Sequence, residues 1–193
     1  QLPIASQVDP KLNKASEVAI HFTNQSDVNL YTELTNIGIP ESGDEIAGES
    51  KLSLSVVFTD LDDNPISVDK IKQGTDFKAI TEIRALDKSA RLENLALTMT
   101  LPSGWQLKNS RLSGAKIAKG LDYQDIRDDQ LLSYFSLGKY LSYQDINQTS
   151  VRIETEFNAS FKGEFYLPGW HVKGMYDHNA WARLKGKWIQ VVS

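Results

Sequence analysis

The sequence predicts an all-β protein built as an antiparallel β-sandwich, and three observations lead to this fold class. Apolar and polar residues alternate over several separate segments, so each segment offers one face to a core and the other to solvent. Turn-forming residues separate these segments at short intervals. Only one short stretch has a helical pattern. Strands with one polar face and short turns favour antiparallel sheets over parallel ones.

The longest alternating segment covers residues 151–161, where Val151, Ile153 and Phe157 point one way and Arg152 and Glu154 the other. This pattern predicts a long, half-buried strand. Shorter rows of alternating apolar residues predict further strands at residues 52–58, 77–85, 95–101 and 131–137.

Reverse turns are predicted at residues 60–65, 102–104 and 162–163, which contain aspartate, asparagine, proline or glycine. The helical pattern lies at residues 179–184, with Asp177 or Asn179 as the N-cap and Gly186 as the stop signal. We therefore expect one short helix near the C-terminus.

Residues 41–50 are predicted to be a linker, because this polar segment contains glycine and has Ile46 as its only large apolar residue. Residues 1–40 offer only two good strand patterns, at residues 18–22 and 28–34, which are too few for an independent β domain. We expect them to complete a β-sheet of a longer chain, since the sequence starts at Gln1 without a signal peptide. Residues 51–193 are then the sandwich domain.

Composition excludes several classes of protein. The chain has 193 residues and a net charge of −4 with no basic stripe, which disfavours nucleic acid or an anionic membrane as the main partner. No apolar run approaches the roughly 20 residues that cross a bilayer. The absence of cysteine excludes disulfides, thiol nucleophiles and thiolate metal sites.

The sequence carries no recognisable catalytic, cofactor or metal motif, so we expect a protein that is not an enzyme. His171 and His178 lack zinc-type spacing. Asp60 begins a segment like a calcium loop, but Pro65 and Ile71 stand where glycine and glutamate are needed, so a plain turn is predicted.

Two clusters remain as candidate sites. Four aspartates surround Arg127, namely Asp122, Asp125, Asp128 and Asp129. They could do acid–base work, but we favour an ion-paired start of a strand or a contact to a neighbouring domain. The second cluster is a loop that carries Met175, Tyr176 and Trp181. These side chains either dock on a partner or pack in the core.

Four segments together resemble the C-terminal region of bacterial alpha-2-macroglobulins. DIRDDQLLSYFSL (residues 125–137) and GEFYLPGWHVKGMYDHNAWARLKGKWIQVV (residues 163–192) are similar to the last domain of that family. NLALTMTLPSGWQL (residues 94–107) is similar to a strand and turn of the same domain. VNLYTELTNIGIP (residues 28–40) resembles the strand that finishes the preceding CUB-like domain. Gln130 and His178 depart from the family pattern, where arginine and proline are usual.

The resemblance implies a partial CUB-like sheet at residues 1–40, a linker, and a final macroglobulin-type sandwich that corresponds to the receptor-binding domain of the animal proteins. It implies a periplasmic trap for endopeptidases, in which this non-catalytic module needs no cofactor and packs on upstream domains. In thioester-bearing members an aromatic residue of this domain shields the reactive bond, and Met175 and Tyr176 match that position best. The expected interdomain contacts are Tyr176, Trp181, Met175, Arg127 and Asp128.

Two other functions stay open from the sequence. A stand-alone adhesion or carbohydrate-binding sandwich would use exposed aromatic residues such as Trp170 as its platform. A hydrolase would use the cluster of four aspartates, although no nucleophile–base motif accompanies it.

Overall fold

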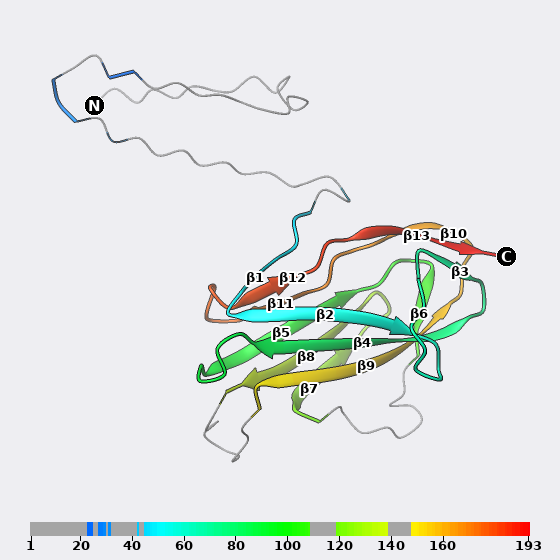
Figure 1. The fold of residues 1–193 in the computed structure, drawn as a ribbon. Helices are drawn as coiled ribbons and strands as arrows, with labels where there is room; N and C mark the ends of the chain where they lie inside the picture. The colour runs from blue at the N-terminus through cyan, green and yellow to red at the C-terminus, as the bar shows by residue number, and fades with distance from the viewer. Residues whose placement is uncertain are drawn as a thin grey trace. The chain divides into compact units, whose positions relative to one another are not determined.

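The computed structural model describes residues 23–24, 27–29, 31, 42, 45–108, 119–138 and 148–193. The chain divides into two units, Gln1–Gly38 and Ile39–Ser193, and every strand in the described part belongs to the second unit. The strand predicted at residues 18–22, and most of the one predicted at residues 28–34, lie outside the described residues. The second unit is a β-sandwich (Figure 1).

One layer is a six-stranded antiparallel sheet. Its strands are, in spatial order, β1 (Gly48–Ser50), β12 (Trp181–Arg183), β11 (His171–Gly174), β5 (Leu92–Thr100), β8 (Gln130–Leu137) and β7 (Leu121–Ile126). Strands that are distant in sequence are neighbours here, since β11 pairs with β5 through Gly174 and Leu95.

The facing layer is a four-stranded antiparallel sheet with the order β2 (Leu52–Thr59), β4 (Asp76–Ala85), β9 (Ser150–Ala159) and β6 (Trp105–Leu107). A smaller sheet has the order β10 (Gly163–Leu167), β13 (Lys187–Val192) and β3 (Lys70–Lys72). The pair of β13 and β3 is parallel, which the antiparallel prediction did not include.

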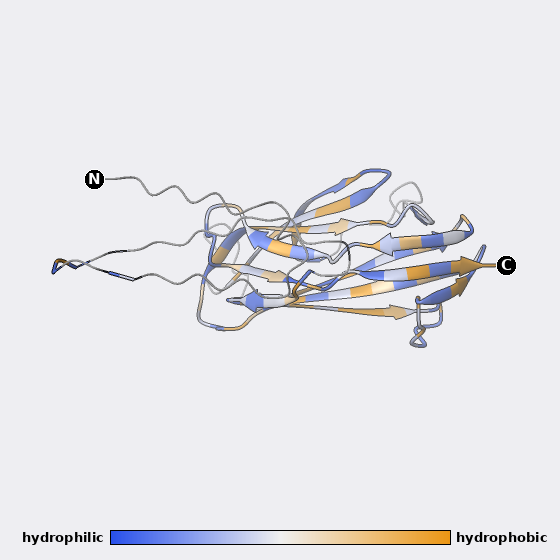
Figure 2. Ribbon diagram, turned by 90° about the horizontal axis from the view of Figure 1, so that it is seen from above, coloured by the Kyte–Doolittle hydropathy of each residue, from blue (hydrophilic) through white to orange (hydrophobic). Residues whose placement is uncertain are grey.

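The predicted strands are confirmed because their alternation matches the pleat of the sheet. In β9 every second residue from Val151 to Ala159 is buried and the residues between them face solvent or are half-buried. β4 and β8 show the same alternation, and Figure 2 shows hydrophilic and hydrophobic residues following one another along the strands. All three sheets contribute to a single core, for example through Leu54, Leu97 and Ile189.

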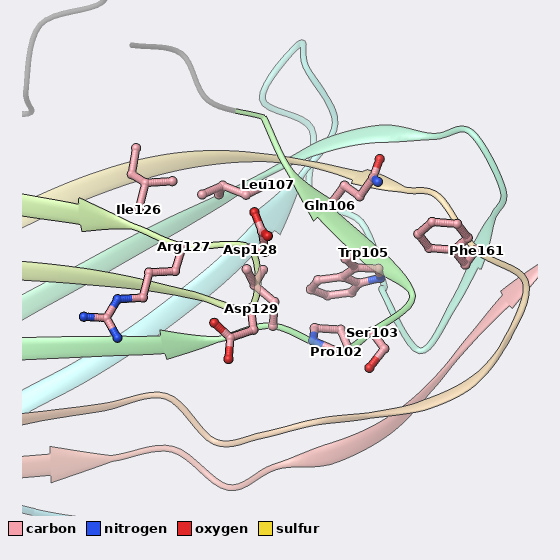
Figure 3. A pocket seen from close by; sticks show the side chains of 11 residues that line it. Pro102, Ser103, Trp105, Gln106, Leu107, Ile126, Arg127, Asp128, Asp129 and Phe161 are labelled. Atoms are coloured by element: carbon pink, nitrogen blue, oxygen red, sulfur yellow. The ribbon is translucent and has the colours of Figure 1, made fainter. Parts of the chain in front are cut away.

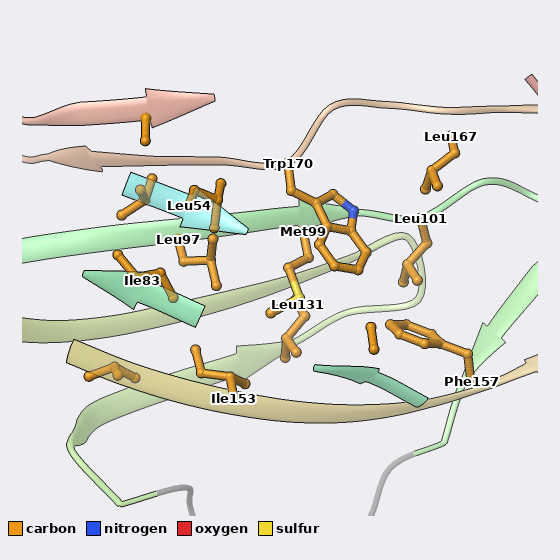
Figure 4. Packing of buried hydrophobic residues seen from close by; sticks show 14 of the residues in the cluster. Leu54, Ile83, Leu97, Met99, Leu101, Leu131, Ile153, Phe157, Leu167 and Trp170 are labelled. Atoms are coloured by element: carbon orange, nitrogen blue, oxygen red, sulfur yellow. The ribbon is translucent and has the colours of Figure 1, made fainter. Parts of the chain in front are cut away.

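Aromatic side chains fill one part of this core. Phe157 lies 5.6 Å from Phe77, 5.8 Å from Trp105 and 6.3 Å from Trp170, measured between ring centroids. Figure 4 shows Trp170 and Phe157 between the sheets, beside Leu101. These three pairs are tilted, and Phe77 also meets Trp105 edge-on at 4.8 Å. Aromatic pairs at such distances add to the stability of a core.

The predicted short helix at residues 179–184 is wrong, since the described residues form no helix and Trp181–Arg183 is strand β12. Ala182 is buried while Trp181 and Arg183 are exposed, which is the period of a strand. A helix this short is unstable on its own, whereas β12 gains backbone hydrogen bonds to a strand on each side, β1 and β11. Asp177 closes a turn instead of capping a helix, because its Oδ1 accepts a hydrogen bond from the Asn179 amide at 3.0 Å.

Two smaller features complete the fold. Residues 48–50, inside the segment assigned to a linker, form the edge strand β1. Asp60 forms the predicted turn, since its Oδ1 accepts hydrogen bonds from the amides of Asp62 and Asn64, both at 2.9 Å. The described part of the chain offers no helix long and apolar enough to cross a membrane.

Candidate functional site

The loop between β11 and β12 presents two large side chains to solvent. Tyr176 is 80% exposed and Met175 is 49% exposed. Their backbone is nevertheless fixed, because the Met175 amide donates to the Asn94 carbonyl oxygen at 2.9 Å and the Gly174 amide donates to the Ala180 carbonyl oxygen at 2.7 Å. A rigid backbone that carries exposed Met and Tyr is well suited to docking, since little entropy is lost on binding.

Glycine is required at the start of this loop. A Cβ atom at Gly174 would lie 2.7 Å from the backbone carbonyl oxygen of Asp177, which is closer than real side chains approach. Gly174 therefore allows the chain to fold back tightly enough to present Tyr176.

An ion pair ties the loop to the start of β2. Lys51 Nζ lies 2.8 Å from Asp177 Oδ2, and both side chains are more than a third exposed. The hydrogen bond from Lys51, followed by that from the Asn179 amide, lowers the pKa of Asp177 from its ordinary value of 3.8. Asp177 thus stays ionised to a lower pH than an ordinary aspartate, and its ion pair holds the base of the loop.

Trp181 follows the loop and lies on the outer face of the six-stranded sheet, where it is 36% exposed. Its indole covers Gly48 of the neighbouring strand β1, since a Cβ there would be 3.0 Å from the Trp181 ring. Met175, Tyr176 and Trp181, which the sequence grouped together, therefore belong to one hairpin.

Arg127 and Asp128 lie at the other end of the sheet. The backbone of β5 joins the two ends, because the Asn94 carbonyl oxygen accepts from Met175 at one end and the Leu101 amide donates to the Asp129 carbonyl oxygen at the other. Seven residue steps along a strand span roughly 20 Å. The structure thus does not bring Arg127 and Asp128 together with the aromatic loop, and the predicted contacts fall into two separate surfaces.

The predicted ion-paired start of strand β8 is present, with Asp125 as the partner of Arg127. Arg127 Nε lies 2.9 Å from Asp125 Oδ2, and the Arg127 amide donates to the Gln130 carbonyl oxygen at 2.9 Å to close the turn. This ion pair is a sufficient structural role for Arg127. Asp128 and Asp129 are exposed.

A cleft of about 620 Å³ opens beside this turn (Figure 3). The turn supplies Arg127, Asp128 and Asp129, and Phe161, which is 53% exposed, also lines the cleft. Trp105 also lines it, and its indole Nε1 has no hydrogen-bond partner among the described residues. The remaining lining residues are Leu101, Pro102, Ser103, Gln106, Leu107 and Ile126.

The structure overturns the idea that Trp170 is an exposed platform for a ligand. Trp170 is only 2% exposed, and its Nε1 donates a hydrogen bond to the Thr100 carbonyl oxygen at 3.0 Å. Its indole is part of the core and cannot stack on a sugar ring. Among the described residues, no group of three or more histidines, cysteines or carboxylates is arranged to hold a metal ion.

A shallow groove of about 380 Å³ on β11 and β12 was not predicted from the sequence. It is lined by His171, Lys173, Trp181 and Arg183, together with Val172 and Ala182. Burial, followed by the charges of Lys173 and Arg183, lowers the pKa of His171 from its ordinary value of 6.5. Residues eight to twelve positions apart in sequence meet here only through the register of the hairpin, which alternation alone does not give.

Comparisons with known proteins assign this domain to a family. A family model, the Bacterial Alpha-2-macroglobulin MG10 domain, matches residues 52–179. No curated protein matches the chain in sequence.

Solved structures of bacterial alpha-2-macroglobulins are similar to this chain. Native alpha-2-macroglobulin from Escherichia coli, in a structure from domain MG7 to the C-terminus, has a TM-score of 0.67 and 17% identity over 81% of this chain and 25% of that one. A mutant of Salmonella alpha-2-macroglobulin has a TM-score of 0.66 and 18% identity over 81% of this chain and 10% of that one. Escherichia coli alpha-2-macroglobulin activated by porcine elastase has a TM-score of 0.65 and 18% identity over 81% of this chain and 14% of that one.

At these identities the structural likeness concerns the fold. The chain spans between a tenth and a quarter of the length of those proteins. The family model, by contrast, matches most of the sandwich in sequence, from the first residue of β2 to the turn before β12. The chain therefore belongs to the bacterial alpha-2-macroglobulin MG10 domain family.

Proposed function

We propose that this chain is a non-catalytic, C-terminal module of a bacterial alpha-2-macroglobulin-like endopeptidase inhibitor, and that it packs on neighbouring domains to hold the native state. Its membership of the MG10 family supports the module, because the similar proteins are several times longer than this chain. An interdomain module needs an exposed, preorganised surface more than it needs reactive groups. The same proposal includes a periplasmic location, and endopeptidases as the targets of the whole protein.

The proposal rests mainly on the exposure of Met175 and Tyr176 in the hairpin loop. Tyr176 is 80% exposed, although its neighbours on both sides are held by backbone or side-chain hydrogen bonds. A large aromatic side chain is costly to leave in water and effective in a contact, where tyrosine is among the residues that contribute most. Met175 beside it adds an adaptable apolar surface.

A protease as the target is supported by what is known of a similar protein. Escherichia coli alpha-2-macroglobulin has been captured in a form activated by porcine elastase. We propose that this chain is part of a protein of the same kind. In that protein the module packs on other domains, and a different part of the protein contacts the protease.

The proposal is tested by calorimetry between this chain and the remainder of its parent protein, produced separately. Wild type should bind saturably, and Tyr176→Ala should weaken binding by about 30-fold, which corresponds to a hot-spot loss of about 2 kcal/mol. Tyr123→Ala is the matched control, because Tyr123 is also exposed but lies on β7 at the far edge of the same sheet.

Equal weakening by both variants would contradict a docking role of the loop. No binding by the wild-type chain would remove the proposed packing function, while the family assignment and the fold would stand.

A further inference from the structure

We infer that the outer face of the hairpin β11–β12 binds an acidic segment of a neighbouring domain. This inference deepens the proposed function, because it names the chemistry of the surface that the module meets. It rests on the position of three basic side chains and one tryptophan around a single groove.

The register of the hairpin brings these side chains to one face. His171 is opposite Arg183, and Lys173 is opposite Trp181. The residues between them, Val172 and Ala182, are buried, so the four named side chains point away from the core. Together they line the groove of about 380 Å³.

No salt bridge among the described residues pairs the cations of this groove. Neither Lys173 nor Arg183 forms a salt bridge there, whereas nearby Lys51 is paired with Asp177. The charges that act on His171 are those of Lys173 and Arg183, and both lower its pKa. On the outer face of the four-stranded sheet, by contrast, arginines are paired with glutamates of their own strand. Arg84 pairs with Glu82 at 2.7 Å on β4, and Arg152 pairs with Glu154 at 3.0 Å on β9.

Arg183 is also held in position to receive an anion. Its Nε and Nη2 donate to the carbonyl oxygen of Ile46 at 3.0 and 2.8 Å. A guanidinium group has five N–H donors, so these two bonds orient the group and leave other donors for a carboxylate. Fixing the side chain in advance reduces the entropy lost on binding.

Trp181 supplies the apolar wall of the groove. Its ring is held over Gly48, as described above, and it is 36% exposed. A peptide segment can lay its backbone and alkyl groups on this ring while its carboxylates reach Lys173 and Arg183. A basic or purely apolar partner would instead bury two unpaired cations, which is costly.

Carbodiimide cross-linking of the parent protein tests this directly. The reagent activates a carboxylate, and the Lys173 amine displaces the urea leaving group to form an amide bond to that residue. Mass spectrometry should find Lys173 joined to an aspartate or glutamate of another domain. Lys72, an exposed lysine on β3, is the control and should form this product far less. The inference would be overturned if Lys173 formed no cross-link to a carboxylate after all the reagent had been consumed.

A charge reversal gives a second readout in the calorimetric assay. Lys173→Glu combined with Arg183→Glu should weaken binding by about tenfold at low salt, and the loss should shrink as salt is raised. Lys70→Glu combined with Lys72→Glu, which changes the net charge by the same amount on the exposed positions of β3, should have little effect. If Tyr176→Ala weakens binding and the charge reversal does not, the docking function stands and the acidic partner is wrong.

Discussion

Replacement of Phe157 by alanine is expected to remove a large part of the stability of the sandwich. Phe157 is fully buried, and its ring contacts Phe77, Trp105 and Trp170. Truncating a buried phenylalanine costs about 3–5 kcal/mol. Three aromatic contacts place Phe157 at the upper end of that range, because each such pair adds about 0.5–1.5 kcal/mol.

The loss is large against the total stability of a domain, which is about 5–15 kcal/mol. With a urea dependence of about 2 kcal/mol per molar, the unfolding midpoint should fall by roughly 2 M. Tryptophan fluorescence reports the transition, because Trp105 and Trp170 are buried against Phe157.

Phe161→Ala is the matched control for this measurement. Phe161 is also a phenylalanine and follows the same strand, but it is 53% exposed, so its midpoint should move by only a small fraction as much. Equal shifts for the two variants would refute the core that the structure assigns to this region.

Two further predictions concern pH and packing. His171 has a pKa lowered in the folded state, so the unfolded chain takes up the proton first as pH falls; stability should therefore decrease as pH drops below about 6.5. His171→Gln should remove that part of the pH dependence in unfolding experiments at pH 5 and 7.5, and an unchanged dependence would contradict it. Gly169→Ala should destabilise the chain by about 1–3 kcal/mol, because the added Cβ would overlap the backbone carbonyl of Leu184. A thermal midpoint equal to wild type would show that this contact can relax.

The strands could be predicted from the sequence because burial of one face imposes a period of two. Residues 151–159 carry this period without a break, and β9 follows it. Strand β1 carries no such signal, since it consists of Gly48, Glu49 and Ser50 and is held by backbone pairing with β12. Residues 179–184 contain good helix formers, yet tertiary pairing overrides this local preference.

The candidate site could be predicted only in part, because sequence reports local structure better than the arrangement of the strands. Local sequence indicates that Met175 and Tyr176 lie in a loop, and the structure exposes them. It does not indicate which strands are neighbours, so the distance between this loop and Arg127 could not be foreseen. The sequence likewise does not distinguish Trp170 from the exposed aromatic residues of the loop, whereas in the structure Trp170 is buried in the core.

Hydrogen exchange of this chain, alone and within its parent protein, tests the central claim most directly. The amides of residues 175–181 should exchange more slowly in the parent protein, because the loop and Trp181 are then covered. The exposed turn at residues 60–65 is the internal reference and should exchange equally in both. Unchanged exchange at residues 175–181, in a parent protein that is folded, would contradict the account of this hairpin as the docking surface.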